Sequence, residues 1–235
     1  MENQIINTTK LAEKLAAKAE EHNWPFLNYF FHQIEFQAII ADLTHEHEKG
    51  HKFTPAFKDV FNAFFMCPSN DIKVIVIGQD PYPQADVADG ISFSCSKTQK
   101  EQPSLRFIFN AIEADVYPEG GYVRDTDLSR WSKQGVIMMN TALTCRVGDI
   151  GSHYAIWKGF TAAFLEYVNK KHKDAVIVLL GNKADEWRPY IKDLHIIKVA
   201  HPASAAYSGG KWDSQNLFNK VNLRLQELGK VPIIW

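Results

Sequence analysis

The sequence predicts an α/β fold, a three-layer sandwich with a central four-stranded parallel sheet flanked by helices. Two observations lead to this fold class. Four short apolar runs occur after residue 70, and they are continuous rather than alternating, as is typical of strands buried on both faces. Helical patterns lie between these runs, and a regular alternation of strands and helices implies parallel crossover connections.

Before residue 70 the pattern is helical. Apolar residues recur at helical spacing over three stretches, at about 11–16, 36–43 and 57–64. Gly50 and Pro55 indicate a turn between the second and the third stretch. The N-terminal part of the chain is therefore expected to be helical.

After residue 70 strands and helices alternate. Two helices are predicted, one over about 105–116, with Pro103 near its N-terminus, and one over about 156–168. Each lies between strand candidates, as a crossover helix should. The four strand candidates span, in chain order, residues 72–78, 135–140, 175–181 and 194–200.

The composition is that of an ordinary folded protein, because 46% of the 235 residues are hydrophobic and 23% are charged. This length suits one large domain. We therefore expect a single domain over residues 1–235, helical over about 1–70 and sheet-forming over about 71–235. The net charge of −1 argues against a protein that binds DNA mainly through bulk positive charge.

Cysteine usage and the apolar segments bear on location. Cys67, Cys95 and Cys145 are scattered and form no CxxC pair, which favours a reducing, intracellular compartment. The N-terminus lacks the apolar segment of a signal peptide, and the longest apolar runs have strand length. We expect a cytoplasmic protein, or a nuclear one in a eukaryote, with no membrane association.

Polar side chains follow the predicted strands at the points where the strands end. Asp80 comes just after the first strand, Asn140 ends the second, Gly181-Asn182 end the third, and His201 follows the fourth. The carboxyl ends of parallel strands lie along one rim of a sheet, and ligands bind there. We therefore expect Asp80, Asn140 and His201 to converge on one site.

The segment after the first strand reads GQDPYP, and its two prolines make it unusually stiff. An amide such as that of Asn140 recognises a planar ligand with an adjacent donor and acceptor, for example a nucleobase edge. A carboxylate can activate water or stabilise a cation, and a histidine can donate a hydrogen bond to a developing anion. Phe93 would stack on such a base, and Tyr82 would close one edge of the pocket.

Several motifs together resemble those of the family 1 uracil-DNA glycosylases. The resemblance keeps the order of the motifs and covers the chain from about residue 57 to Trp235. The motifs are GQDPYP at 78–83, GISFS at 90–94, PSL at 103–105, LSRWSKQGV at 128–136, GVIMMNTALT at 135–144, SH at 152–153, the His201-Pro202 loop and the ending GKVPIIW.

The resemblance implies a monofunctional DNA glycosylase, a hydrolase that flips uracil out of DNA and cleaves its N-glycosidic bond. The products would be free uracil and an abasic site, in base-excision repair, with no metal or organic cofactor. Asp80 would orient water and stabilise the sugar cation, and a neutral His201 would support the departing uracil anion at O2. Asn140 would read N3–H and O4 of uracil.

The resemblance also assigns the walls of the site and its partners. Phe93 would stack on uracil, Tyr82 would exclude the thymine methyl group, and Gln79 would form a pocket wall. The partners would be single- or double-stranded DNA that contains uracil, together with a proteinaceous inhibitor, and the protein would be a monomer. The residues expected to grip the DNA backbone are Pro103, Ser104, Ser152, His153, Gly181, Asn182 and Ser204.

The loop after His201 departs from the family pattern His-Pro-Ser-Pro-Leu-Ser. The phosphate-binding serine aligns with Ala203, for which Ser204 is a substitute, and the second proline is missing. The leucine that enters the emptied base stack aligns with Ala205, which is too short to fill that gap. Ala205 and Tyr207 are therefore the wedge candidates. Pro83 also replaces a histidine that is common in the family.

Two other functions stay open. The altered loop at 203–206 suits a glycosylase-fold DNA-binding subunit with reduced catalysis, although the retained site residues argue against it. His47-Glu48-x-x-His51 matches a zinc metalloprotease motif, which requires both histidines on one helix face. Gly50 lies inside this motif and indicates a helix end, so a chance match is the better interpretation.

Overall fold

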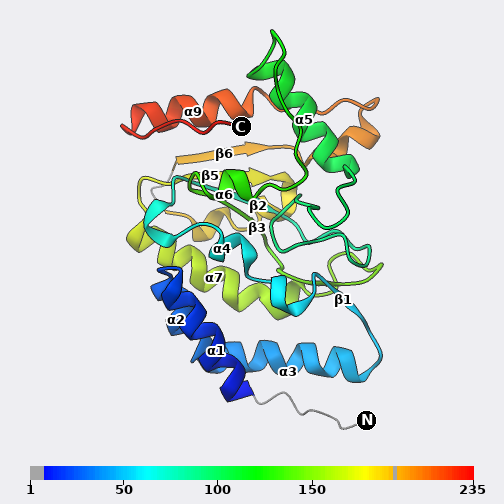
Figure 1. Ribbon diagram of the computed structural model, residues 1–235, viewed down its shortest axis with the longest axis vertical. Helices are drawn as coiled ribbons and strands as arrows, with labels where there is room; N and C mark the ends of the chain where they lie inside the picture. Colours follow the sequence, from blue (N-terminus) through cyan, green and yellow to red (C-terminus); the bar gives the residue numbers. More distant parts are fainter. Residues whose placement is uncertain (1–7, 193–194) are drawn as a thin grey trace.

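The computed structural model describes residues 8–192 and 195–235. A four-stranded parallel sheet with the order β3-β2-β5-β6 runs through its middle (Figure 1). The predicted fold class and the four predicted strands are confirmed. Leu194, where the fourth strand was expected to begin, lies outside the described residues. The strands are β2 (Val74–Gly78), β3 (Val136–Asn140), β5 (Val176–Leu180) and β6 (His195–Val199).

Helices cover both faces of this sheet. Val76 and Val178 on one face pack toward Ile108 and Val221, which belong to α5 (Pro103–Asp115) and α9 (Leu217–Glu227). On the other side lies α7 (Tyr154–Lys171), and a further group of three helices lies beyond it (Figure 1). This group consists of α1 (Thr8–Glu21), α2 (Pro25–Phe31) and α3 (Ile34–Glu48).

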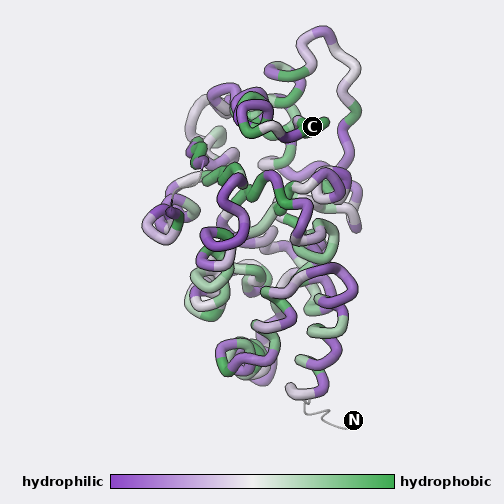
Figure 2. Tube along the Cα trace, turned by 90° about the vertical axis from the view of Figure 1, so that its left-hand side faces the viewer, coloured by the Kyte–Doolittle hydropathy of each residue, from purple (hydrophilic) through white to green (hydrophobic). Residues whose placement is uncertain are grey.

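Aromatic side chains join α7 to the N-terminal helices. The Phe160 ring lies 5.1 Å from the ring of Phe30 and 5.6 Å from that of Phe64. The indole of Trp24 donates a hydrogen bond of 2.7 Å to the carbonyl of Phe64. The most hydrophobic segments run through the middle of the molecule, while the outer helices alternate between hydrophilic and hydrophobic turns (Figure 2). The N-terminal helices thus share one core with the sheet.

The two edges of the sheet differ. Every residue of β2, β3 and β5 is buried, as their continuous apolar runs predict. In β6 only Val199 is buried, so the expected burial on both faces is wrong for this strand. The other edge strand, β3, is covered by the short helices α4 (Asn62–Phe65) and α6 (Ser129–Ser132).

The apolar stretch at 57–64 forms two short pieces instead of one helix. A 3-10 turn spans Phe57–Asp59, and α4 begins at Asn62. The Ala63 N–H donates to the carbonyl of Gly90, at 3.2 Å, and not to the carbonyl four residues before it. The loop at 89–90 therefore takes over a hydrogen bond that a continuous helix needs.

A small second sheet was not predicted. In it, β1 (Phe53–Thr54) pairs in antiparallel fashion with β4 (Cys145–Arg146). Two-residue strands carry no periodic signal, which explains why the sequence does not reveal them. This pairing ties the segment that follows α3 to the loop that follows β3. None of the described helices is both long and apolar enough to cross a lipid bilayer.

Candidate active site

The carboxyl ends of β2 and β3 lie side by side, with Gly78 opposite Asn140. The carbonyl of Gln79 accepts a hydrogen bond of 2.7 Å from the Thr141 hydroxyl, which fastens the two strand ends together. A cleft of about 170 Å³ opens at this rim. Its lining residues are Gln79, Asp80, Pro81, Tyr82, Pro83, Phe93, Ser104, Asn140, Ile150, His201 and Ala203.

The predicted convergence of Asp80, Asn140 and His201 is therefore found in the structure, because all three line this cleft. Asp80 is half-buried, and its Oδ2 accepts a hydrogen bond of 2.6 Å from the Gly151 N–H. Burial raises the pKa of Asp80 above its ordinary value, and the Gly151 hydrogen bond opposes part of this rise. The result is an oriented carboxylate whose pKa is closer to neutral pH, which suits a general base.

His201 is held as a neutral imidazole. Its Nδ1 accepts a hydrogen bond of 3.1 Å from the Ala203 N–H, so the ring proton resides on Nε2. Burial lowers the pKa of His201 to about 4, because the charged form loses solvation. At neutral pH the side chain therefore offers an Nε2–H donor without a positive charge.

Asn140 lies over Gly78, and that glycine makes room for its amide. Asn140 is 8% exposed. A Cβ atom added to Gly78 would lie 2.5 Å from the Asn140 Oδ1 and 3.5 Å from the Phe93 ring. The amide thus occupies the space that a side chain on the neighbouring strand would fill.

We expect the substitution Gly78→Ala to lower kcat/KM by roughly tenfold or more on uracil-containing DNA, the substrate that the motifs predict, because the new methyl group displaces the Asn140 amide and small misplacements are costly. Steady-state kinetics on a uracil oligonucleotide measure the effect. Gly159→Ala is the matched control, since no atom lies within 4 Å of a Cβ built there. Wild-type kcat/KM in Gly78→Ala would contradict this account of the amide.

The predicted stacking ring, Phe93, sits in a strained loop. Its φ angle of +65° lies in the left-handed region, which a bulky residue rarely adopts. Its ring centroid is 5.5 Å from that of His201. The Tyr82 hydroxyl donates a hydrogen bond of 2.9 Å to the Phe93 carbonyl. Burial raises the pKa of Tyr82, so this hydroxyl keeps its proton.

Asp89 supports this loop, a role that was not predicted from the sequence. The buried Asp89 carboxylate accepts hydrogen bonds from the Ile91 N–H at 3.1 Å and from the Ser94 hydroxyl at 2.6 Å. It also accepts from the Ser96 N–H at 3.0 Å. The sequence signal is weak, because Asp-Gly followed by serines is also the pattern of an ordinary turn.

Some residues expected at the DNA backbone lie near the rim. Ser104, in the first turn of α5, lines the cleft. Asn182 is exposed at the start of α8 (Gly181–Asp185), directly after β5. Gly181 itself is buried, and a Cβ atom there would lie 2.8 Å from the His201 Cβ, so this glycine leaves space for the histidine. Pro103 is exposed and Ser204 is partly exposed.

The side chains of two of these residues make contacts within the protein. His153 is fully buried, and its Nδ1 lies 2.8 Å from the Thr144 hydroxyl, so its side chain does not reach a DNA backbone. Ser152 donates its hydroxyl proton to the Asp149 carbonyl at 2.7 Å, which leaves its side chain no donor for a phosphate. Both side chains organise the 145–153 loop instead.

The two wedge candidates, Ala205 and Tyr207, differ in exposure. Ala205 is fully buried, so the expectation that it marks the wedge position is wrong for its side chain. Tyr207 ends the same 3-10 helix, Pro202–Tyr207, and is 94% exposed. Only Tyr207 of the two can enter a base stack.

The two histidines of the metalloprotease motif do not lie on one helix face, as a zinc site of that class requires. The helix α3 ends at Glu48, and Gly50 follows with a φ of +81°. His51 therefore lies outside the helix, where its Nδ1 is 3.0 Å from a carboxylate oxygen of Glu46. Over residues 8–192 and 195–235, no group of three or more His, Cys, Asp or Glu side chains is arranged to hold a metal ion.

Known proteins resemble this chain in sequence and in fold. The family model described as the uracil DNA glycosylase superfamily matches residues 64–226. A uracil-DNA glycosylase of Anoxybacillus flavithermus is 37% identical over 222 residues, which cover 92% of this chain and 96% of that protein. The uracil-DNA glycosylase of Amoebophilus asiaticus is 35% identical over 218 residues, which cover 90% of this chain and 96% of that protein.

Solved structures agree with these relatives. The crystal structure of mimivirus uracil-DNA glycosylase is 26% identical with a TM-score of 0.81, and the match covers 92% of this chain and 86% of that one. A variant of mimivirus UNG in complex with UGI matches with a TM-score of 0.80 at 26% identity, covering 91% of this chain and 87% of that one. The chain therefore belongs to the uracil-DNA glycosylase superfamily, which confirms the family predicted from the motifs.

Proposed function

We propose that this protein is a monofunctional uracil-DNA glycosylase that releases free uracil and leaves an abasic site, the first step of base-excision repair. The observation that carries this proposal is the cleft at the carboxyl rim of the sheet, lined by Asp80, Asn140 and His201 together. The target nucleotide is flipped out of the stack, because the bond to be cleaved is out of reach inside a duplex.

Base selection follows from the Asn140 amide. Its Oδ1 accepts from uracil N3–H and its Nδ2 donates to O4, whereas cytosine presents the opposite pattern and would leave buried polar groups unpaired. Phe93 stacks on the ring, and Tyr82 occupies the space that a thymine methyl group would need. The hydrogen bond of 2.9 Å from the Tyr82 hydroxyl to the Phe93 carbonyl fixes the positions of these two residues relative to each other.

Bond cleavage uses Asp80 and His201 from two sides of the cleft. The C1′–N1 bond breaks with its electron pair moving to uracil, and the His201 Nε2–H hydrogen-bonds the resulting anion at O2. Asp80 stabilises the cationic sugar and accepts a proton from the water whose oxygen bonds to C1′. Among the described residues that line the cleft there is no lysine, so a strand-cleaving Schiff base is not part of the proposal.

The DNA backbone is gripped by residues around the rim. We assign this role to Pro103, Ser104, Gly181, Asn182 and Ser204, whose contacts would offset the few kcal/mol that base flipping costs. The protein acts as a monomer on single- or double-stranded DNA inside the cell. Its three cysteines are free and buried, which suits a reducing compartment. Inhibition by a protein such as UGI also belongs to the proposal.

The wedge function is assigned to Tyr207. We expect Tyr207→Ala to slow uracil release from duplex DNA by roughly tenfold, because one aromatic–base stacking contact is lost, while release from single strands is unchanged. Rates on matched single- and double-stranded oligonucleotides measure this difference. Tyr29→Ala is the control, since Tyr29 is 66% exposed on the outer helix α2. An unchanged duplex rate in Tyr207→Ala would refute the wedge role.

Base selectivity tests the proposed function. Oligonucleotides that differ only in one uracil, thymine or cytosine are incubated with the protein and assayed for abasic sites. We expect abasic sites from uracil alone. DNA binding without cleavage of any substrate would favour the DNA-binding subunit instead.

A further inference from the structure

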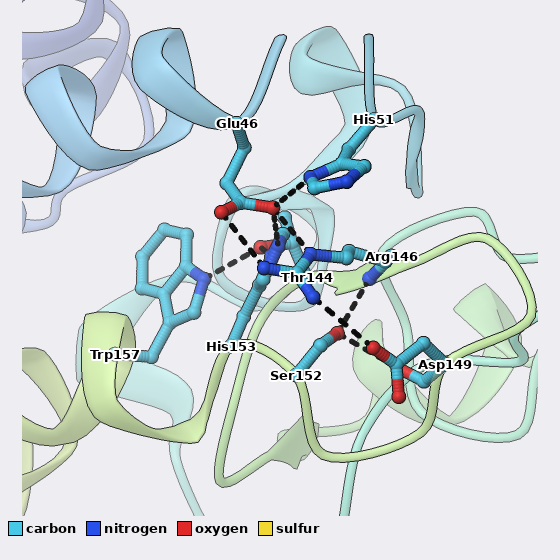
Figure 3. A network of polar contacts seen from close by, with 8 residues as sticks. All are labelled: Glu46, His51, Thr144, Arg146, Asp149, Ser152, His153 and Trp157. Carbon is cyan, nitrogen blue, oxygen red and sulfur yellow. Dashed lines mark hydrogen bonds and ion pairs between the residues drawn. The ribbon is translucent and has the colours of Figure 1, made fainter. Parts of the chain in front are cut away.

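A polar network lies beside the cleft, where the end of α3 meets the loop at 145–153 (Figure 3). Its centre is Glu46, which is 8% exposed. Arg146 forms a bidentate contact with this carboxylate: its Nη2 donates to Oε1 at 2.9 Å and its Nε donates to Oε2. The Arg146 guanidinium lowers the pKa of Glu46 to about 2, so the pair is charged at any ordinary pH.

Two histidines complete the surroundings of Glu46 (Figure 3). The His51 Nδ1 lies 3.0 Å from the Glu46 Oε2, and the His153 Nε2 lies 3.8 Å from it. The Thr144 hydroxyl accepts from the Trp157 indole at 2.7 Å, and it lies 2.8 Å from the His153 Nδ1. These contacts hold the buried His153 ring between Thr144 and Glu46.

The loop that begins at Arg146 is closed by its own hydrogen bonds. The Arg146 N–H donates to the Ser152 hydroxyl at 2.8 Å, and that hydroxyl donates to the Asp149 carbonyl at 2.7 Å. The Arg146 Nη1 also reaches the Asp149 carboxylate at 3.3 Å. The guanidinium thus links the inside of the loop to helix α3.

The same loop holds the GQDPYP segment at three points. The Cys145 thiol contacts the Pro81 carbonyl at 3.5 Å, and the Gly148 N–H donates to the Pro83 carbonyl at 2.9 Å. The third point is the Gly151 N–H, which donates to the Asp80 carboxylate at 2.6 Å. A displacement of the loop would therefore reach the carboxylate directly.

We propose that Glu46 and Arg146 are positioning residues, whose ion pair fixes the 145–151 loop so that the Gly151 N–H orients the Asp80 carboxylate. Neither residue is among those that line the cleft. This inference rests on the proposed function, because it takes Asp80 as the group that acts in bond cleavage. It also gives a role to the buried Glu46 carboxylate in the last turn of α3, a helix of the outer layer.

The inference predicts different effects on kcat and on KM. Asp80 acts mainly in the transition state. The hydrogen bonds from the 145–151 loop to the GQDPYP segment end on Asp80, Pro81 and Pro83, and none of them ends on Asn140 or Phe93, which bind the base. Loosening the network should therefore lower kcat and leave KM nearly unchanged. If the substitution merely destabilised the fold, the apparent kcat would fall because less of the enzyme is folded. That loss of kcat would disappear at lower temperature.

The test is Glu46→Gln, which keeps the shape of the side chain and removes its charge. We expect kcat for uracil release to fall about tenfold with KM within twofold, measured well below the melting temperature of the variant. Arg146→Lys, which keeps the charge and loses the bidentate contact, should show a smaller loss in the same direction. Glu113→Gln is the matched control, because Glu113 is held by Arg124 at 2.8 and 2.6 Å on the other side of the sheet.

Combining Glu46→Gln with Asp80→Asn tests whether Glu46 acts through Asp80. If Glu46 acts through Asp80, Glu46→Gln should cause no further loss of kcat in the Asp80→Asn background. A wild-type kcat in Glu46→Gln, or the same tenfold loss with asparagine at position 80, would overturn the inference. Absence of uracil release by the wild-type protein would instead refute the proposed function, so the two failures are distinguishable.

Discussion

Asp80→Asn should lower the rate of uracil release by about 10³-fold, because an amide neither accepts a proton from water nor stabilises the cationic sugar. The change is nearly isosteric, so the affinity for uracil-containing DNA should stay within a few-fold. Single-turnover rates at saturating enzyme measure the chemical step, and fluorescence anisotropy measures binding.

Asp86→Asn provides a matched control for Asp80→Asn. Asp86 is exposed in the segment that follows the GQDPYP motif, and its φ of +61° is one that asparagine adopts readily. We expect wild-type rates in this variant. A residual rate above one tenth of wild type in Asp80→Asn would show that the carboxylate is not the principal catalytic group.

His201→Leu should lower the rate of uracil release by about 10²-fold or more, the usual effect of removing one donor to a developing anion. Because its pKa is about 4, His201 is already neutral at pH 5–8 and should add no acid limb near pH 6.5 to the rate profile. The exposed His32 offers the control His32→Leu.

The same histidine should make folding stability depend on pH. Its pKa is about 4 when folded, below the value of roughly 6.5 in an unfolded chain, so the unfolded state binds more protons between these values. Stability should therefore fall as pH drops from about 6.5 to about 4. Denaturant unfolding of wild type and His201→Leu across this window should show a flatter curve for the variant; parallel curves would contradict the neutral, buried imidazole.

The sheet and the central part of the cleft follow from sequence because they depend on strong, local patterns. Continuous apolar runs define the strands, and the rule that parallel strands share one rim brings Asp80, Asn140 and His201 together. Residues almost adjacent to strand ends need no knowledge of loop conformation to be placed. The exposure of β6 was not predicted, because a sequence does not say which edge of a sheet is left uncovered.

The supporting parts of the site depend on tertiary contacts that have no periodic signal. Asp89 and the Glu46–Arg146 pair act through backbone N–H groups of loops, whose directions are decided only in the folded chain. Motif alignment placed His153 and Ala205 in functional loops, but it could not indicate that both side chains point into the interior. The break in the helix at 57–64 likewise arises from the distant carbonyl of Gly90.

Product analysis tests the central claim most directly. The wild-type protein is incubated with an oligonucleotide that carries one uracil, and free uracil, abasic sites and strand breaks are all quantified. We predict one free uracil for each abasic site, no strand break before alkali treatment, and about 10³-fold slower formation of both products with Asp80→Asn. Intact uracil in DNA that the wild-type protein has bound would contradict the account.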